Sequence, residues 1–142
     1  MTKEEVRTVS IAKLKLTKNA VIYDVGAGTG SVSIEAALQG ENLRVYAIEK
    51  NPEGAELIRK NMKFRTDQIQ VIEGVAPEAL EALEMPTHAF IGGSTGQLKE
   101  IIQCIKKKNP DVRIVINAIS LETVKEAMEA MEEGLLADPE II

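Results

Sequence analysis

The stretch from residue 20 to residue 30 reads AVIYDVGAGTG, and it decides the fold. Its first six residues form a short, mostly apolar and β-branched run, which is typical of a buried strand. Three glycines then alternate with small residues and lead into helix-forming residues at 31–39, with Gly40 as a stop signal. A buried strand that passes through a glycine-rich turn into a helix predicts the first half of a parallel β-α-β unit.

The same alternation of strand and helix signals continues along the chain. Further strands are predicted at residues 43–48, 69–72, 89–91 and 112–116. Further helices are predicted at residues 52–64, 77–83, 94–108 and 120–133. Because crossovers between parallel strands are right-handed, this pattern predicts an α/β fold, a doubly wound Rossmann-like sheet with helices on both faces.

We expect a single domain with three parts. They are a basic N-terminal arm or helix at 1–18, a β-α-β core at 19–134, and the start of a further strand at 135–142. The length of 142 residues and a hydrophobic share of 44% suit one packed domain, and a charged share of 27% argues against disorder. We find no membrane span and no apolar leader, and expect a cytoplasmic protein.

The few chemically distinctive side chains exclude several kinds of site. One cysteine, Cys104, and one histidine, His88, predict no internal disulfide and no metal centre. Cys104 is expected on a helix, half-buried and inert, and His88 at the start of a strand, where it is structural. Aromatic residues make up 3% without tryptophan, and the net charge is −5, which argues against a nucleic-acid partner.

Charge is unevenly distributed along the sequence. Residues 1–18 hold five basic and two acidic residues, a balance of +3, whereas the remainder holds 12 basic and 20 acidic residues, a balance of −8. A cationic arm on an acidic body suits an anionic small-molecule ligand. A solvated helix of mixed charge explains the arm equally well. The run 106–108, three lysines, is expected to be a solvated helix end.

The glycine-rich turn is the first candidate binding element. Three glycines at alternate positions let a ligand press against bare backbone at a helix start. The spacing G-x-G-x-G differs from the dinucleotide fingerprint G-x-G-x-x-G, because residue 31 is serine. The alternative is a tight strand-to-helix turn without a ligand. The candidate cofactor-binding residues here are Asp24, Gly26, Ala27, Gly28, Thr29 and Gly30.

Two further loops strengthen this interpretation. Glu49 ends the second predicted strand with Lys50 beside it, about 20 residues after the glycines, where a carboxylate accepts both hydroxyls of a ribose. The alternative for Glu49 is a cap on the helix that begins near Pro52. The small apolar loop of Gly74, Val75 and Ala76, which follows the third strand, suits the flank of an adenine ring.

Together these features resemble the class I S-adenosylmethionine-dependent methyltransferases, over nearly the whole chain. The resemblance implies that Asp24 and the glycines surround the methionine part of the cofactor. It implies that Glu49 binds the ribose and that residues 74–76 touch the adenine edge. Gly92, after the fourth strand, is carried over as a further cofactor contact.

A narrower resemblance rests on five segments in order: MTKEEVR, DVGAGTGSVSIEAA, GVAPEAL, FIGGSTG and INAISLETV. They are similar to the decarboxylating C15-methyltransferase family of cobalamin biosynthesis, which acts on precorrin-6B or cobalt-precorrin-6B. This resemblance implies S-adenosylmethionine as cofactor, a tetrapyrrole substrate, decarboxylation of the C12 acetate and a homotetramer. The matching positions outside the cofactor loops are Thr2, Lys3, Arg7, Gly92, Gly93, Asn117, Glu122 and Thr123.

For the substrate, the resemblance implies specific roles at these positions. Lys3 and Arg7 pair with the acetate and propionate arms of the tetrapyrrole, Gly92 and Gly93 let a bulky ring approach, and Asn117 orients it by hydrogen bonds. A solvated N-terminal helix and a helix-entry cap are the alternatives for the charged residues and for Asn117. No catalytic base is assigned.

The sequence departs from the family pattern at its end, because a full class I sheet has seven strands and the last two form an antiparallel hairpin. We expect this hairpin to be missing or truncated, which leaves the strand at 112–116 as an open apolar edge. Three other functions stay open: a methyltransferase for RNA, protein or another small molecule, an NAD-dependent oxidoreductase, and a cofactor-binding module without turnover. The segment FIGGSTG in place of an Asn-Pro-Pro-Tyr motif, the glycine spacing and the lack of a second domain count against the first two.

Overall fold

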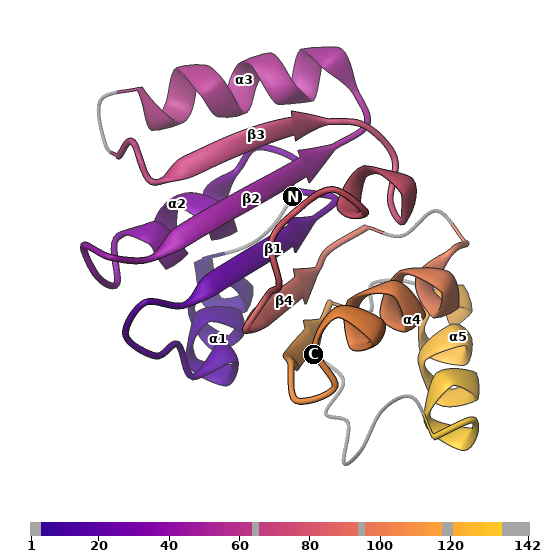
Figure 1. Ribbon diagram of the computed structural model, residues 1–142. Helices are drawn as coiled ribbons and strands as arrows, with labels where there is room; N and C mark the ends of the chain where they lie inside the picture. Colours follow the sequence, from indigo (N-terminus) through magenta and orange to yellow (C-terminus); the bar gives the residue numbers. More distant parts are fainter. Residues whose placement is uncertain (1–3, 64–65, 94–95, 118–120, 135–142) are drawn as a thin grey trace.

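The computed structural model describes residues 4–63, 66–93, 96–117 and 121–134. Its centre is a parallel five-stranded sheet in the order β3-β2-β1-β4-β5 (Figure 1). The strands are β1 (Val21–Val25), β2 (Arg44–Glu49), β3 (Ile69–Glu73), β4 (His88–Ile91) and β5 (Arg113–Ile116). The strand order reverses between β1 and β4, and open α/β sheets bind ligands beyond the carboxyl ends of the strands at this point.

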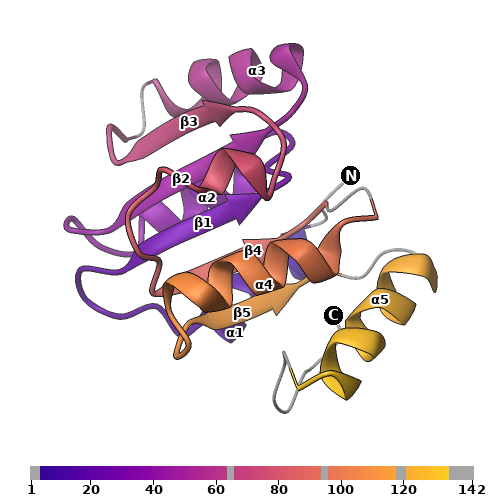
Figure 2. The ribbon, with the colours of Figure 1, turned by 45° about the vertical axis from the view of Figure 1, so that its right-hand side comes forward.

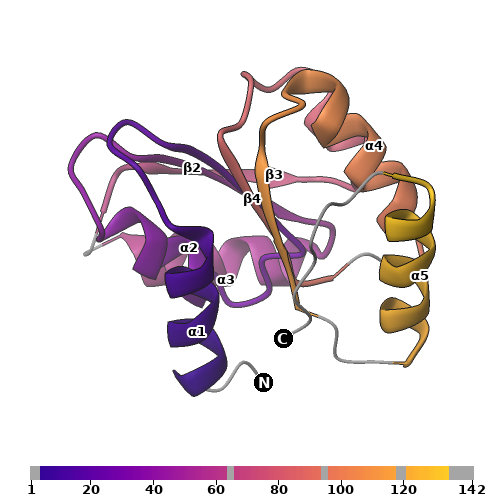
Figure 3. The same ribbon diagram turned by 90° about the horizontal axis from the view of Figure 1, so that it is seen from below.

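Helices cover both faces of the sheet, as the sequence predicts. They are α1 (Glu4–Leu14), α2 (Ser31–Ala37), α3 (Pro52–Met62), α4 (Leu98–Lys108) and α5 (Leu121–Glu132), with a short 3-10 turn, η1 (Glu78–Leu80). Seen from below, α1, α2 and α3 lie on one face and α4 and α5 on the other (Figure 3). In Figure 2, α5 lies beside α4, and Ala127 and Ala130 of α5 belong to the same buried cluster as the inner face of α4.

β1 is the central strand of the sheet and is covered on both faces. All five of its residues are buried, which suits a parallel strand covered on both faces. Val21, Tyr23 and Val25 pack into the cluster under α4, whereas Ile22 packs into the cluster under α2 and α3. Successive side chains of a strand alternate between faces, so Asp24 points to the same side as Ile22, toward α2.

Several helix predictions had wrong boundaries, among them the one at 52–64, which ends at Met62. The helix predicted at 94–108 begins at Leu98, because Gly96 adopts a left-handed φ of 80° and Gln97 is the cap. The segment predicted as a helix at 77–83 forms only the three-residue η1, since so short a segment does not repay the cost of helix nucleation. The helix predicted at 31–39 ends at Ala37, with Leu38 as its cap.

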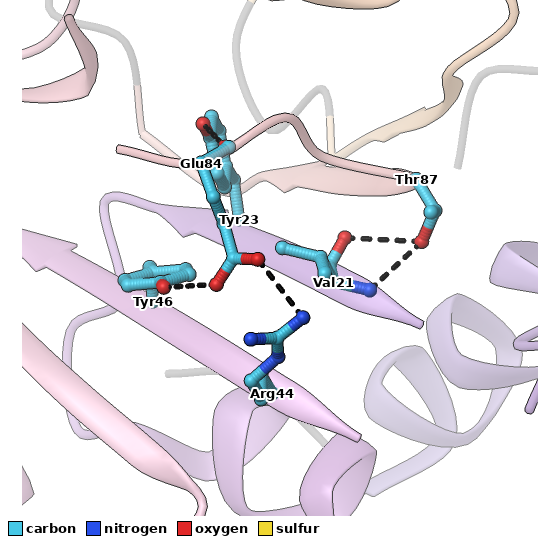
Figure 4. Close-up of polar contacts among 6 residues, drawn as sticks. All are labelled: Val21, Tyr23, Arg44, Tyr46, Glu84 and Thr87. Carbon is cyan, nitrogen blue, oxygen red and sulfur yellow. Dashed lines mark hydrogen bonds and ion pairs between the residues drawn. The ribbon is translucent and has the colours of Figure 1, made fainter. Parts of the chain in front are cut away.

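The loop before β4 is fixed by side chains of β1 and β2 (Figure 4). Tyr23 donates its hydroxyl proton to the backbone oxygen of Glu84, and Tyr46 donates to the Glu84 carboxylate. Arg44 forms an ion pair with the other carboxylate oxygen of Glu84 at 2.9 Å. The Thr87 hydroxyl lies 2.9 Å from the backbone nitrogen and 3.1 Å from the backbone oxygen of the first residue of β1. The loop is therefore tied to the sheet at both ends.

His88 lies at the start of β4, at the opposite end of the strand from the loops expected to bind ligands. It is buried, with Nδ1 2.7 Å from the Thr87 hydroxyl and Nε2 3.3 Å from the backbone oxygen of Lys15. Burial lowers its pKa. These contacts give His88 the structural place that the sequence predicts, between the end of α1 and the sheet.

β5 is an edge strand of the sheet in the part of the chain described here, with β4 as its neighbour. Residues 135–142, where the start of a sixth strand was expected, lie outside the described residues. None of the described helices is long and apolar enough to cross a membrane.

Candidate functional site

A cavity of about 170 Å³ opens at the carboxyl ends of the strands, on the side of β1 and β2. Three apolar side chains line it, from the ends of β1 and β2 and from α4: Val25, Ile48 and Ile101. The predicted site residues that also line it are Gly26, Glu49, Lys50, Gly74, Val75, Ala76 and Gly93. Three loops that are far apart in sequence, after β1, β2 and β3, thus meet as the sequence predicts.

Glu49 joins two of these loops. Its Oε1 accepts a hydrogen bond from the Gly28 backbone N–H at 2.9 Å, and its Oε2 accepts one from the Asn51 backbone N–H at 3.1 Å. A carboxylate has about four acceptor positions, so two protein contacts leave both oxygens able to accept further hydrogen bonds. The helix cap itself is Asn51, whose side chain accepts from the Glu53 N–H at 2.9 Å. The capping alternative therefore describes Asn51 better than Glu49.

Gly54, in the first turn of α3, lies against the Glu49 side chain and was not singled out by the sequence. A Cβ at this position would lie 3.0–3.3 Å from three atoms of the Glu49 side chain. Because Gly54 has no side chain, the Glu49 carboxylate has space to turn toward the loop after β1. An isolated glycine inside a helix that begins directly after a candidate site is the signal for such a role. Ile101 was also missed, because its helical spacing shows only that it faces inward.

The glycine loop is held against both neighbouring strands. The N–H groups of Gly26 and Ala27 donate to the Ile48 oxygen at 2.9 and 3.0 Å. Gly26 has a φ of 72°, and a Cβ there would lie 2.6–2.8 Å from the backbone of Gly93. Gly28 has a φ of 60° but open space around it. The loop after β1 and the loop after β4 are therefore in backbone contact, and the loop surface at Gly28 is accessible.

Asp24 lies beneath this loop and is not among the residues that line the cavity. It is 1% exposed, and the Ser33 hydroxyl donates to its Oδ2 at 2.5 Å. Its Oδ1 is buried and has no partner among the described residues. Burial raises the pKa of this carboxyl to about 6, against an opposing effect of the Ser33 hydrogen bonds. The Asp24–Ser33 pair joins the end of β1 to the first turn of α2.

Arg7 and Thr29 lie at a second cavity. It has a volume of about 190 Å³ and is lined by Arg7, Thr29, Ser31, Ile34, Glu35 and Asn61. Arg7 comes from α1, the middle four residues from the glycine loop and α2, and Asn61 from α3. The predicted substrate residue Arg7 is therefore separated by the glycine loop from the cavity at Glu49.

The remaining predicted site residues are placed only in part. A Cβ on Gly92 would lie 3.1 Å from the Phe90 ring, and the backbone N–H of Asn117 donates to the Ile91 oxygen at 2.9 Å. Thr2 and Lys3 lie outside the described residues, as does the side chain of Glu122. Thr123 lies on α5 and is half-buried.

Cys104 and the lysines at 106–108, which the sequence also singles out, lie outside the two cavities. Cys104 is half-buried on α4, and burial raises the pKa of its thiol. The lysine run is not wholly solvated as predicted, because Lys108 donates to the backbone oxygens of Glu81 and Leu83 at 3.1 and 2.7 Å. Among the described residues, no group of three or more acidic, histidine or cysteine side chains is arranged to hold a metal ion.

The lining of the cavity has the chemistry that a nucleoside site requires. Small and apolar side chains make its walls, as an adenine ring requires, and at one end Glu49 offers acceptor oxygens to a ribose diol. The open surface at Gly28 continues the site over the glycine loop. This chemistry agrees with the cofactor that the sequence analysis implied.

Comparisons with known proteins point the same way. Residues 1–135 match a family model described as "Precorrin methyltransferase domain". A relative from Sulfurisphaera tokodaii, named probable cobalt-precorrin-6B C(15)-methyltransferase (decarboxylating), is 43% identical over 94% of this chain and 71% of its own length.

Two solved structures are similar in sequence and in fold. The precorrin-6y C5,15-methyltransferase of Geobacter metallireducens is 42% identical, with a TM-score of 0.88 over 94% of this chain and 72% of that one. The precorrin-8W decarboxylase of Methanobacterium thermoautotrophicum is 41% identical, with a TM-score of 0.85 over the same shares.

Proposed function

The chain belongs to the precorrin methyltransferase family, and on that premise we propose that it methylates C15 of precorrin-6B or cobalt-precorrin-6B. The methyl donor is S-adenosylmethionine, and the C12 acetate of the substrate loses CO2, so that a methyl group remains at C12. The observation that carries the proposal is the position of the Glu49 carboxylate, at the end of an apolar cavity and against the glycine loop.

We assign the cofactor contacts from this geometry. Glu49 accepts hydrogen bonds from the ribose hydroxyls, with Lys50 at the rim, and residues 74–76 flank the adenine ring. The loop of Gly26, Ala27, Gly28, Thr29 and Gly30 holds the methionine part through its backbone. Asp24 acts indirectly, by fixing the loop from below. When bound, this cofactor supplies a methyl group on a positively charged sulfur.

The contribution of the chain to methyl transfer is mainly positioning. Transfer from a sulfonium is an in-line displacement, in which holding donor and acceptor in line accounts for much of the rate. The electron-rich carbon of the tetrapyrrole needs no strong base to attack. For the loss of CO2, the electron pair of the broken C–C bond passes into the conjugated ring, and a proton from solvent replaces the carboxyl. Gly92, Gly93 and Asn117, at the ends of β4 and β5, are the proposed substrate contacts.

The test is a reaction followed by product mass. The protein is incubated with S-adenosylmethionine and either precorrin-6B or its cobalt form under anaerobic conditions. We expect a product that has gained one methyl group and lost one CO2, and no product without the cofactor. A protein that binds the cofactor but yields neither change would contradict the proposed reaction. The homotetramer implied by the resemblance stays a prediction, which light scattering checks.

A further inference from the structure

The first turn of α4 begins without a cap from its own sequence. Gln97 is the residue before the helix, and within the described part of the chain its side chain makes no capping hydrogen bond. Gly96, directly before it, has a left-handed φ of 80°. The first N–H groups of a helix have no acceptor within that helix. The start of α4 therefore depends on an acceptor from another element of the fold.

Glu126 of α5 supplies this acceptor. Its Oε2 accepts a hydrogen bond from the Leu98 backbone N–H at 3.1 Å. Leu98 is fully buried and Glu126 is half-buried, so the contact is partly shielded from water. A carboxylate at this place is also favoured by the positive end of the helix dipole. Ala127 and Ala130 pack α5 against the inner face of α4 (Figure 2), and this packing holds the Glu126 side chain at the start of α4.

The turn that Glu126 caps is part of the wall of the cofactor cavity. Ile101 lines that cavity, and its backbone N–H donates to the Gln97 oxygen at 3.0 Å, which closes the turn. Gly93, on the other side of the loop after β4, lines the same cavity, and its N–H donates to the Val25 oxygen at 3.3 Å. The two described sides of this loop are thus held differently, one by a backbone contact and the other by the Glu126 side chain.

We propose that Glu126 is a positioning residue for cofactor binding, which holds the first turn of α4 so that Ile101 forms the wall of the cavity at Glu49. This inference rests on the proposed function, because it takes the ligand of that cavity to be the S-adenosyl cofactor. Glu126 is not among the residues that line the cavity, so it acts through Leu98 and Ile101. Without the cap, the first turn is ordered in a smaller fraction of the molecules, and the apparent affinity falls with that fraction.

A second contact between the same two helices provides a matched control. Lys99 Nζ and Glu133 Oε1 are 3.0 Å apart and form an ion pair between two partly exposed side chains. Glu133→Ala removes the same charge from the same helix as Glu126→Ala does, but it leaves the hydrogen bond to the α4 backbone in place. Exposed ion pairs of this kind contribute little to stability.

A third variant separates positioning from a general loss of stability. Glu84→Ala removes the carboxylate that binds Tyr46 and Arg44 in the loop before β4, at the opposite end of that strand from the cavity. It should destabilise the protein without disturbing α4.

The test is calorimetric titration of the full chain with S-adenosylhomocysteine. Circular dichroism verifies that each variant is folded, and urea unfolding measures its stability. Glu126→Ala removes the acceptor and suits a helix, whereas Glu126→Gln keeps an acceptor oxygen at the same reach. Glu126→Asp keeps the charge on a side chain that is one methylene shorter, and it is judged by the same criteria if Glu126→Ala does not fold.

We expect Glu126→Ala to weaken S-adenosylhomocysteine binding about fivefold and Glu126→Gln to stay within about twofold of wild type. Glu133→Ala and Glu84→Ala should bind as wild type does. A purely structural role would lower the stability of Glu126→Ala and leave its affinity unchanged, which would overturn the proposal. Equal losses of affinity in Glu126→Ala and Glu84→Ala, or in Glu126→Ala and Glu126→Gln, would also overturn it. Failure of the wild type to bind S-adenosylhomocysteine would instead count against the proposed function itself.

Discussion

At the scale of single residues, Glu49 connects the loops after β1 and β2 and is the residue that we propose binds the ribose of the cofactor. Its two oxygens already accept the N–H groups of Gly28 and Asn51. Substitution of Glu49 by glutamine keeps the size of the side chain but removes the charge and replaces one acceptor with a donor. We predict that Glu49→Gln weakens S-adenosylhomocysteine binding by about 1–3 kcal/mol, the cost of a lost charge-assisted hydrogen bond, as measured by calorimetry.

A matched control lies on the neighbouring strand. Glu73 ends β3 in register with Glu49, and its side chain does not line the cavity. Glu73→Gln makes the same charge change and should leave the affinity near that of wild type. Equal loss of affinity in the two variants would show that the effect is general electrostatics, and the ribose assignment would be wrong.

Asp24 makes the stability of the protein depend on pH. Burial raises its pKa from 3.8 in the unfolded chain to about 6 in the folded protein. Between these values the folded protein binds more protons than the unfolded chain, so the free energy of unfolding falls as the pH rises. A shift of about two units corresponds to about 3 kcal/mol. This contribution is fully present below about pH 4 and is lost as the pH rises through about 6.

The variant Asp24→Asn isolates this effect. The amide oxygen still accepts from the Ser33 hydroxyl, and the neutral side chain carries no charge into the buried site. We predict that, relative to wild type, Asp24→Asn gains about 3 kcal/mol of unfolding free energy between pH 4 and pH 7. Urea unfolding at both pH values measures it. A constant difference between the two proteins across this range would contradict the raised pKa.

At the scale of elements, the contact between the loops after β1 and β4 makes Gly26 indispensable. A methyl group there would overlap the Gly93 backbone at 2.6–2.8 Å, whereas a methyl group on Gly28 meets open space. Both glycines have positive φ, so both alanine variants bear the left-handed strain of about 1–2 kcal/mol. We predict that Gly26→Ala loses at least about 2 kcal/mol more stability than Gly28→Ala in urea unfolding. Equal losses would mean that the two loops do not touch.

The loop before β4 offers a second test at this scale. The Glu84 carboxylate is the partner of Tyr46 and Arg44 (Figure 4). Removing it leaves the Tyr46 hydroxyl, which is half-buried, without that acceptor. We predict that Glu84→Ala lowers the unfolding free energy by about 1–2 kcal/mol, while Glu81→Ala, at an exposed position in the same segment, changes it by less than about 0.5 kcal/mol. Similar values for the two variants would show that the loop is held by its backbone alone.

At the scale of the whole molecule, the order of elements could be predicted because each strand is a short apolar run bounded by strong turn residues. β1 and the glycine loop fix the first unit, and the next four strands repeat it. Helix ends were harder to place, since they depend on backbone dihedral angles: a helix pattern at 94–108 does not reveal that Gly96 is left-handed. The family, by contrast, was visible from five short segments, and the comparisons confirm it.

Residues of the candidate site could be predicted only where a short sequence motif or the end of a predicted strand marks them. Glu49 was found because strand ends at the same edge of a parallel sheet converge. Gly54 and Ile101 were not, since their roles arise from packing between elements that the sequence does not align. The position of Asp24 beneath the loop, instead of in the cavity, depends on which face of β1 it occupies and on its bond to Ser33. The second cavity, at Arg7, exists only once α1 is placed against α2.

The central claim is that the cavity at Glu49 binds S-adenosylmethionine. Calorimetric titration of the wild-type protein with S-adenosylhomocysteine tests it most directly, with NAD titrated in parallel, because both ligands present an adenosine but only one belongs to methyl transfer. We predict a micromolar dissociation constant for S-adenosylhomocysteine and no binding of NAD. Absence of S-adenosylhomocysteine binding, or equal binding of NAD, would contradict the account.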